Sequence, residues 1–251
     1  MKIVAIVQAR MGSERLPGKT LKRVSGKPML EHIIQRVMSS NNIHTIVIAT
    51  TNNKKDQPII NLSKRLSISY YAGSEDDVLN RFIGAVESVS TDAEINSAQV
   101  IVVRICGDNP LIDIRYLDEM INSHMLKCAE YTYNDSPIPV GTSGEVVNYM
   151  ILKRVNGIAR GGRYREHVTT YILDHLNEFR VNRTTPPAYL KDKTFRLTVD
   201  TEEDLKLIRR IYKNLYSKGD IVETARAITL LEENPSLLKI NIHIPQRDWR
   251  L

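Results

Sequence analysis

The sequence has little of what marks several protein classes. It contains only two cysteines, Cys106 and Cys128, which are too few for a disulfide framework and lack metal-ligand spacing. No apolar run approaches the roughly 20 residues that a membrane-spanning helix needs. One lysine precedes an apolar strand at the N-terminus, without the cleavage site of a signal peptide. We therefore expect a cytoplasmic protein with reduced thiols and no membrane partner.

Features of nucleic-acid-binding proteins are also scarce. The net charge of +6 favours anionic partners in general. However, the basic residues are scattered, the chain has three phenylalanines and one tryptophan, and no helix-turn-helix, zinc-finger or RNA-binding motif accompanies the charge. A small anionic substrate explains the charge better, so we expect no nucleic-acid partner.

The composition and periodicity that are present indicate an α/β enzyme-sized domain. Hydrophobic residues make up 42% and charged residues 25% of the 251 positions, close to globular averages. Strand-like runs at 3–7, 45–49, 68–71 and 100–105 alternate with helix-like runs at 29–39, 57–66 and 78–89. This alternation predicts a mostly parallel sheet flanked by helices, with ligands beyond the carboxyl ends of its strands.

The pattern changes after Tyr131. We expect a single domain over 1–251, with an insertion at about 132–194 and a C-terminal helical tail at about 217–251. Within this part the sequence predicts a helix at 169–176, a returning strand at 195–199, a long helix at 201–216 and a helix at 222–233 that Pro235 stops. Thr201 and Asp204 resemble a capping box at the start of the long helix.

A glycine-bearing basic loop follows the first strand. Gly12 and Gly18 permit close backbone approach, Ser13 can donate to a phosphate oxygen, and the cations Arg10, Arg15 and Lys19 can neutralise a triphosphate. The alternative is a solvated turn with incidental basic residues. The spacing of a Walker A motif is absent.

Two aspartates follow strand-like runs. Asp108 lies in the turn Gly107–Pro110 after the apolar run at 100–105, and Asp200 follows the run at 195–199. Two carboxylates together with substrate phosphates are a common way to hold Mg²⁺. For Asp108 the alternative is a turn aspartate, whereas Glu202, Glu203 and Asp204 fit the N-terminus of the following helix.

Taken together, these motifs resemble those of the sugar-acid cytidylyltransferases. Gln8 to Lys19 is similar to the signature loop of CMP-Kdo synthetases and, more loosely, of CMP-acylneuraminate synthetases. The spore coat polysaccharide biosynthesis branch matches best and also shows the motifs at 73–81, 104–112, 165–169 and 199–201. The resemblance spans about residues 3–215, and several ordered motifs are more specific than one.

The resemblance implies a GT-A-like (Rossmann-like) fold, CTP and Mg²⁺ as cosubstrates, and a homodimer. It implies that the metal ligands are Asp108 and Asp200, and that Ser74 and Arg81 belong to the cytosine or ribose pocket. The nucleotide contacts that it implies in the loop are Ala9, Arg10, Gly12, Ser13, Arg15 and Lys19. Arg10, Lys19 and both aspartates would then be catalytic. Cys106 departs from the family pattern, because CMP-Kdo synthetases have a base-reading glutamine there.

The acceptor is expected in the middle of the chain. The candidates are Glu145, Arg165, Glu166 and His167, with Arg165 suited to a sugar carboxylate by bidentate pairing. His167 is equally well explained as a helix-terminal histidine without a ligand. The expected reaction is attack of a sugar hydroxyl on the α-phosphorus of CTP with release of pyrophosphate. Asp108, Asp200 and a metal-bound hydroxide are alternative proton acceptors.

Other functions remain as alternatives. A GT-A glycosyltransferase would use a nucleotide sugar, although its usual Asp-x-Asp motif is absent from this sequence. A nucleotidyltransferase could also use another nucleotide or a sugar phosphate. A catalytically silent nucleotide-binding scaffold is disfavoured by the presence of both aspartates and all three loop cations.

Overall fold

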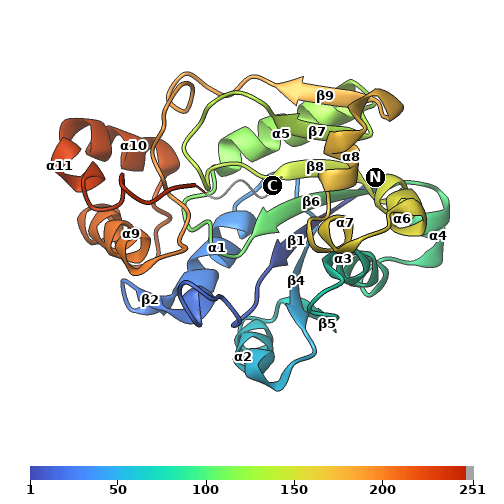
Figure 1. Cartoon of the computed structure of the whole chain (residues 1–251), viewed down its shortest axis with the longest axis horizontal. Coiled ribbons are helices and arrows are strands. Elements are labelled where there is room, and N and C mark those ends of the chain that lie inside the picture. The colour runs from blue at the N-terminus through green and yellow to red at the C-terminus, as the bar shows by residue number, and fades with distance from the viewer. Residues whose placement is uncertain (247–251) are drawn as a thin grey trace.

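A seven-stranded sheet forms the centre of the molecule (Figure 1). The structure is a computed structural model and describes residues 1–246. The strands are β1 (Lys2–Gln8), β4 (Thr45–Thr51), β5 (Ser69–Gly73), β6 (Val100–Cys106), β7 (Tyr131–Asn134), β8 (Glu145–Asn148) and β9 (Val181–Thr184). Their order is β5-β4-β1-β6-β8-β7-β9. β8 runs antiparallel to both of its neighbours, and the other adjacent pairs are parallel.

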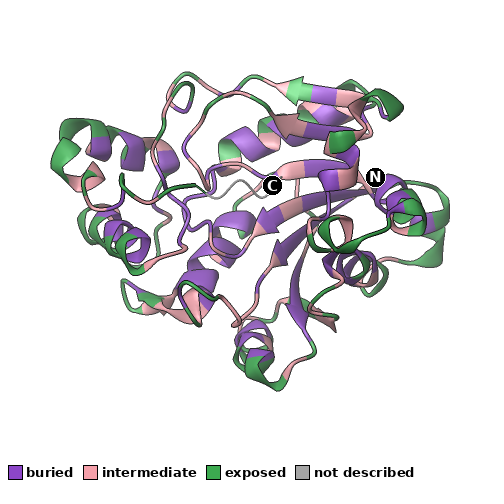
Figure 2. Cartoon of the chain, viewed as in Figure 1, coloured by how far each residue is buried: buried purple, intermediate pink, exposed green. Residues whose placement is uncertain are grey.

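Helices cover both faces of this sheet and divide the core in two. One face packs against α1 (Met29–Met38), α2 (Gln57–Arg65) and α5 (Ile114–Leu126), and α9 (Glu202–Leu215) and α10 (Thr224–Glu233) join the same apolar cluster. The other packs against α3 (Val78–Glu87), α4 (Asp92–Asn96), α6 (Tyr149–Ile158) and α8 (Thr170–Asp174). The central strands β1, β4 and β6 are largely buried, and the outer helix faces are exposed (Figure 2). Each fully buried aliphatic side chain contributes roughly 1.5–3 kcal/mol.

The first half of the chain follows the sequence prediction. The four predicted strands and three predicted helices form β1, β4, β5, β6, α1, α2 and α3. The α/β fold with a mostly parallel sheet is therefore confirmed. Apolar stripes such as Leu30, Ile33, Ile34 and Val37 on α1 are fully buried. A small ribbon of β2 (Arg23–Val24) and β3 (Lys27–Pro28) and the 3-10 turns η1 (Lys19–Leu21) and η2 (Lys54–Asp56) complete this half.

The second half departs from the prediction in two places. Residues 195–199 form a single bridge, Val140 to Arg196, and no strand, so the predicted returning strand is wrong. The physical reason is that the backbone of this segment bonds to two different loops. Leu197 N donates to the Val140 carbonyl, whereas Val199 N donates to the Asp108 carbonyl. Pro235 follows α10 but also begins α11 (Pro235–Leu238), since proline is well suited to a first helical position.

The long helix and its capping box are confirmed. α9 starts after Thr201, whose hydroxyl accepts from Asp204 N, and the Asp204 side chain accepts from Thr201 N. Farther upstream, the predicted helix at 169–176 is shorter, as α8, and α7 (Gly162–Glu166) and η3 (Leu176–Glu178) flank it.

The segment expected as an insertion belongs in part to the main sheet. Residues 132–194 supply β8, β9 and most of β7. In the expected tail, α10 packs on α9 and α11, and residues 247–251 lie outside the described residues. None of the helices in residues 1–246 combines the length and apolar character needed to cross a membrane.

Candidate functional site

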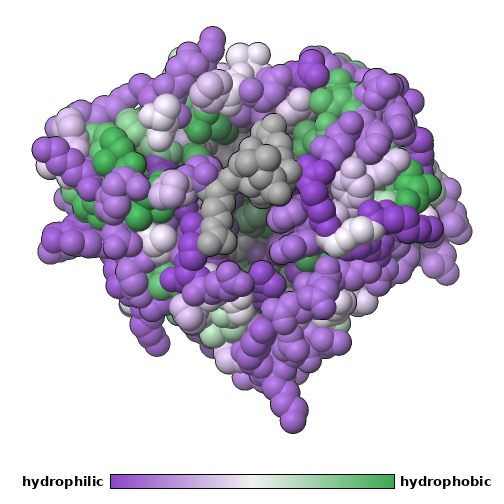
Figure 3. Space-filling view, in the orientation of Figure 1, coloured by the Kyte–Doolittle hydropathy of each residue, from purple (hydrophilic) through white to green (hydrophobic). Residues whose placement is uncertain are grey.

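A large cavity opens at the carboxyl ends of β1 and β6. Its volume is about 1310 Å³, more than the roughly 300–1,000 Å³ of a site for one small ligand. The loop after β1, the turns at Asp108 and Asp200, the loop at 133–145 and the α7–α8 segment line it. In Figure 3 hydrophilic residues border the hollowed centre of this face. The cavity therefore has space for a nucleotide and an acceptor together.

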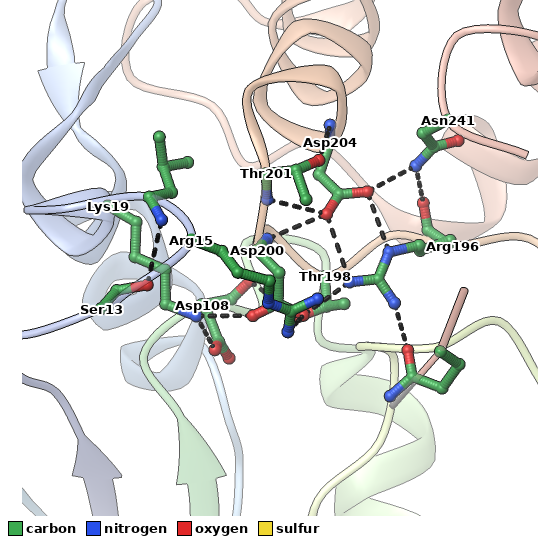
Figure 4. A network of polar contacts seen from close by, with 12 residues as sticks. Ser13, Arg15, Lys19, Asp108, Arg196, Thr198, Asp200, Thr201, Asp204 and Asn241 are labelled. Atoms are coloured by element: carbon green, nitrogen blue, oxygen red, sulfur yellow. Dashed lines mark hydrogen bonds and ion pairs between the residues drawn. The ribbon is translucent and has the colours of Figure 1, made fainter. Parts of the chain in front are cut away.

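Lys19 joins the two predicted metal ligands at the base of this cavity. Its Nζ lies 2.6 Å from Asp108 Oδ2 and 2.8 Å from Asp200 Oδ1, as Figure 4 shows. Burial opposes its charge, but the two carboxylates outweigh this effect and raise the pKa of Lys19. Because both oxygens contact one nitrogen atom, a single cation at this point can be shared by both aspartates.

Further cations surround Asp200. Arg15 Nη2 lies 3.1 Å from Asp200 Oδ2, and Arg196 Nη2 also pairs with that carboxylate. Burial would raise the pKa of Asp200, but Lys19, Arg15 and Arg196 outweigh it, so the pKa is lowered. The ionised form of Asp200 is therefore favoured.

Arg196 is held by residues that the sequence analysis did not select. Its Nε lies 2.9 Å from Asp204 Oδ1, and its Nη1 donates to Gln246. Asn241 Nδ2 donates both to Asp204 Oδ1 and to the Arg196 carbonyl, each at 2.9 Å. Figure 4 shows the Arg196 guanidinium bonded to both Asp200 and Asp204. Sequence spacing offered no signal for Arg196, because 195–199 reads as an ordinary strand.

The remaining loop residues lie around the same opening. Ala9, Arg10, Ser13, Arg15 and Lys19 line the cavity. Arg10 Nη1 lies 3.3 Å from Glu75 Oε1, and Ser13 Oγ accepts a long bond of 3.4 Å from Leu16 N.

The loop also has contacts that fix its path. Met11 N donates to Asp56 Oδ1 at 2.7 Å. A Cβ at Gly12 would lie 2.8 Å from Lys55 Nζ, a contact that the flexible lysine side chain can relieve by shifting. Gly18 has φ 68°, a conformation that glycine adopts without strain. The structure places Gly12 next to the cavity-lining residues but not in the lining itself.

Arg81 lies in the cavity wall with unused donors. Its side chain is 1% exposed, and its Nη1 donates to the Ser74 carbonyl at 2.6 Å. Its Nε and Nη2 have no hydrogen-bond partner within residues 1–246. Burial, with the nearby Arg10, lowers the pKa of Arg81 to about 10. Ser74 lies outside the lining and accepts a bond from Asp77 N at the start of α3.

Gln8 and Cys106 are cross-strand neighbours. They pair in register between β1 and β6, so both side chains lie on the same sheet face, and both line the cavity. The buried Gln8 Oε1 has no partner in the described part of the chain, and burial raises the pKa of the Cys106 thiol. Gln8 begins the motif Gln8 to Lys19, but the sequence predicted no role for it. The strand alternation that buries Val4 and Ile6 on this face would have identified it.

A second buried polar group lies toward β7 and β8. Arg104 and Glu145 are opposite each other in the β6–β8 ladder, and Arg104 Nη1 pairs with Glu145 Oε2. Glu145 also accepts from Tyr131 Oη and, at 3.0 and 3.1 Å, from Thr169 Oγ1. Of this group, Arg104, Glu145 and Thr169 line the cavity.

The structure separates the other predicted acceptor residues. Glu166 and His167 line the cavity, and burial lowers the pKa of His167. Arg165 does not line it. Its guanidinium pairs with Asp77 and donates to the Asn156 carbonyl, which ties α7 to α3 and α6. The structure therefore does not place Arg165 where it would meet an acceptor.

The carboxylates can be considered as a metal site. No cluster of three or more His, Cys, Asp or Glu with metal-binding geometry occurs in residues 1–246. Mg²⁺, however, is usually bound through one or two carboxylates plus substrate phosphates and water. The shared contact of Asp108 and Asp200 with one ammonium group fits that kind of site.

Known cytidylyltransferases resemble this chain in sequence and in fold. The profile of the cytidylyltransferase family matches residues 4–229. The chain belongs to the cytidylyltransferase family. A cytidylyltransferase from Leptospira borgpetersenii has a similar structure, with a TM-score of 0.85, 26% identity and coverage of 99% of this chain and 100% of that one.

Two further relatives differ in the extent of the match. The spore coat polysaccharide biosynthesis protein SpsF of Bacillus subtilis is 35% identical over 93% of this chain and 95% of its own length. The 3-deoxy-manno-octulosonate cytidylyltransferase of Geobacter metallireducens is 28% identical, but over only 48% of this chain and 44% of its own length. The protein is thus a nucleotidyltransferase, and the resemblance of its motifs to this family is confirmed.

Proposed function

We propose that this cytidylyltransferase transfers CMP from CTP to a hydroxyl group of a sugar acid, with release of pyrophosphate, in polysaccharide or surface glycan biosynthesis. The observation that carries the proposal is the contact of Lys19 with both Asp108 and Asp200 beneath the loop that bears Arg10 and Arg15. Fixed cations next to paired carboxylates suit a metal-bound triphosphate. We place the reaction in the cytoplasm and expect a homodimer, which light scattering of the purified protein would test.

The nucleotide is assigned to the part of the cavity near β1 and α3. Arg10, Ser13, Arg15 and Lys19 would contact the triphosphate, with Ala9 and Gly12 forming the adjacent backbone. The unused donors of Arg81 suit the base carbonyl, and the unpaired Gln8 oxygen suits the exocyclic amino group of cytosine. Gln8 would thereby supply, from the neighbouring strand, the carboxamide that Cys106 does not provide.

Mg²⁺ is the proposed cofactor, and Asp108 and Asp200 would hold it. When bound, the ion would neutralise charge on the triphosphate and help to orient it. Lys19 would then move its contacts from the carboxylates toward phosphate oxygens, because it occupies the point at which the two aspartates converge.

The chain's own residues contribute mainly by positioning and charge. The cationic loop would stabilise the departing pyrophosphate while the acceptor hydroxyl attacks the α-phosphorus in line. Asp200 is a poor proton acceptor because three cations lower its pKa.

A binding screen and a turnover assay test the proposal. CTP with Mg²⁺ should raise the melting temperature more than UTP, GTP or ATP, since a ligand that binds only the native state stabilises it. Pyrophosphate release from CTP should require a sugar acid, with 3-deoxy-manno-octulosonate and N-acetylneuraminate as the first probes. Stabilisation by a nucleotide sugar but not by CTP would contradict the proposal and favour a glycosyltransferase.

A further inference from the structure

Arg104 is the basic residue that reaches the part of the cavity beyond the nucleotide. Five arginines and lysines in the described chain line the cavity: Arg10, Arg15, Lys19, Arg81 and Arg104. The first three belong to the loop after β1, and Arg81 lies on α3. Arg104 alone of these contacts β8, through Glu145, and it lies near His167. A ligand anion at this end of the cavity would therefore meet one permanent cation.

The surroundings of Arg104 hold its guanidinium but do not use up its donors. Arg104 Nη1 donates a hydrogen bond to Glu145, whereas the buried Arg104 Nε has no hydrogen-bond partner within residues 1–246. The oxygens of Glu145 are shared with the hydroxyls of Tyr131 and Thr169. Since a guanidinium has five N–H donors, Arg104 retains the capacity to bind a second carboxylate. Both carboxylate oxygens of Glu145 already accept hydrogen bonds from the protein. Its role is therefore to position Arg104.

Besides Glu145, three acidic residues of the described chain line this end of the cavity: Asp135, Glu166 and Asp174. Asp135 lies 3.3 Å from Arg183, and Asp174 lies 2.6 Å from Arg163. Both therefore already have cationic partners. His167 favours the neutral form because burial lowers its pKa. Arg104 consequently remains the positive group at this end of the cavity.

We propose that Arg104, oriented by Glu145, binds the carboxylate of the acceptor and so selects an acid over an uncharged sugar. The inference rests on the proposed transfer of CMP to a sugar acid and adds the residue that recognises the acid. It transfers to Arg104 the role that the sequence suggested for Arg165.

A matched pair of variants tests this assignment. Arg104 and Arg165 have similar side-chain exposure, 21% and 23%, and each pairs with one carboxylate. Arg104→Gln should raise KM for the sugar acid about ten- to hundredfold and leave KM for CTP within about twofold. Arg165→Gln removes a comparable ion pair outside the cavity lining and should change the acceptor KM less than threefold. Equal effects of the two variants, or an effect of Arg104→Gln on CTP alone, would overturn the proposal.

A change in the ligand provides a second test, which starts with the wild-type enzyme. The wild-type enzyme should prefer 3-deoxy-manno-octulosonate or N-acetylneuraminate to its own carboxamide by tenfold or more. Arg104→Gln should lose that preference, and Arg104→Lys should keep part of it. Melting temperatures without ligand show whether each variant is folded.

The outcomes also separate this inference from the proposed function. Stabilisation by CTP with equal use of acid and carboxamide overturns the role of Arg104 only. Stabilisation by CTP with no use of any sugar acid overturns the sugar acid as acceptor, and the role of Arg104 with it. Absence of both CTP stabilisation and pyrophosphate release overturns the proposed function.

Discussion

The two ends of the cavity are built in different ways. At the nucleotide end, ion pairs join segments far apart in the chain, since Lys19 is 89 residues from Asp108 and 181 from Asp200. At the other end, Arg104 and Glu145 face each other across one strand ladder. The nucleotide end is consequently sensitive to the loss of charge. The other end depends on strand pairing, and within residues 1–246 Arg104 is the arginine or lysine that lines it.

The largest expected effect is at the nucleotide end. Asp108→Ala and Asp200→Ala should each reduce kcat by at least about hundredfold, because each removes a proposed ligand for the metal and triphosphate. Pyrophosphate release at varied Mg²⁺ concentration measures the effect. Glu202→Gln is the control, since Glu202 is exposed at the same helix terminus and pairs with Lys22. Near-normal turnover in either aspartate variant would contradict the metal assignment.

The next effect should be confined to nucleotide binding. Arg81→Leu removes the buried donors near α3 and should raise Kd for CTP by about tenfold or more. The acceptor KM should change little, because Arg81 contacts Ser74 and no residue of β7 or β8 in the described chain. Calorimetric titration of CTP and acceptor kinetics provide the two measurements. A larger change in acceptor KM than in CTP binding would mean that the two ends are not separate.

A smaller effect concerns acid stability. The lowered pKa of Asp200 gives stability that is present above the unfolded-state value of about 3.9 and is lost as pH falls through the lower native value. Between pH 5 and pH 3, the melting temperature of Asp200→Asn should therefore fall less than that of the wild type. The exposed Asp220→Asn should follow the wild type. If the melting temperatures of the wild type and Asp200→Asn fall in parallel with pH, the ion pairs of Asp200 do not stabilise this end of the cavity.

The smallest effect should arise from the helix cap behind Asp200. Thr201→Ala removes the hydroxyl that accepts from Asp204 N and should lower the free energy of unfolding by about 0.5–2 kcal/mol. Urea denaturation measures this change. Thr91→Ala, which removes the capping-box hydroxyl of the five-residue α4, is the matched comparison and should cost less. A larger loss from Thr91→Ala would show that the α9 cap does not support the nucleotide end.

Local patterns explain what could be predicted. Strands β1, β4 and β6 follow from apolar runs that are largely buried, and the basic loop and the Asp108 turn lie in contiguous motifs. β7, β8 and β9 are four residues each, too short for a clear periodic signal. The segment at 195–199 has strand-like residues, yet its backbone divides its hydrogen bonds between Val140 and Asp108. That division depends on tertiary contacts.

The sequence by itself determined the α/β order, the basic loop after the first strand, the turns that carry the two aspartates, and the family, because each depends on residue types close together in the chain. Only the tertiary structure decided which arginine lines the cavity near β8. Arg165 is drawn to Asp77, 88 residues away, whereas pairing of β6 with β8 holds Arg104 at the cavity. It likewise placed Gln8 beside Cys106. Strand register and long-range ion pairs arise from folding, and no local spacing encodes them.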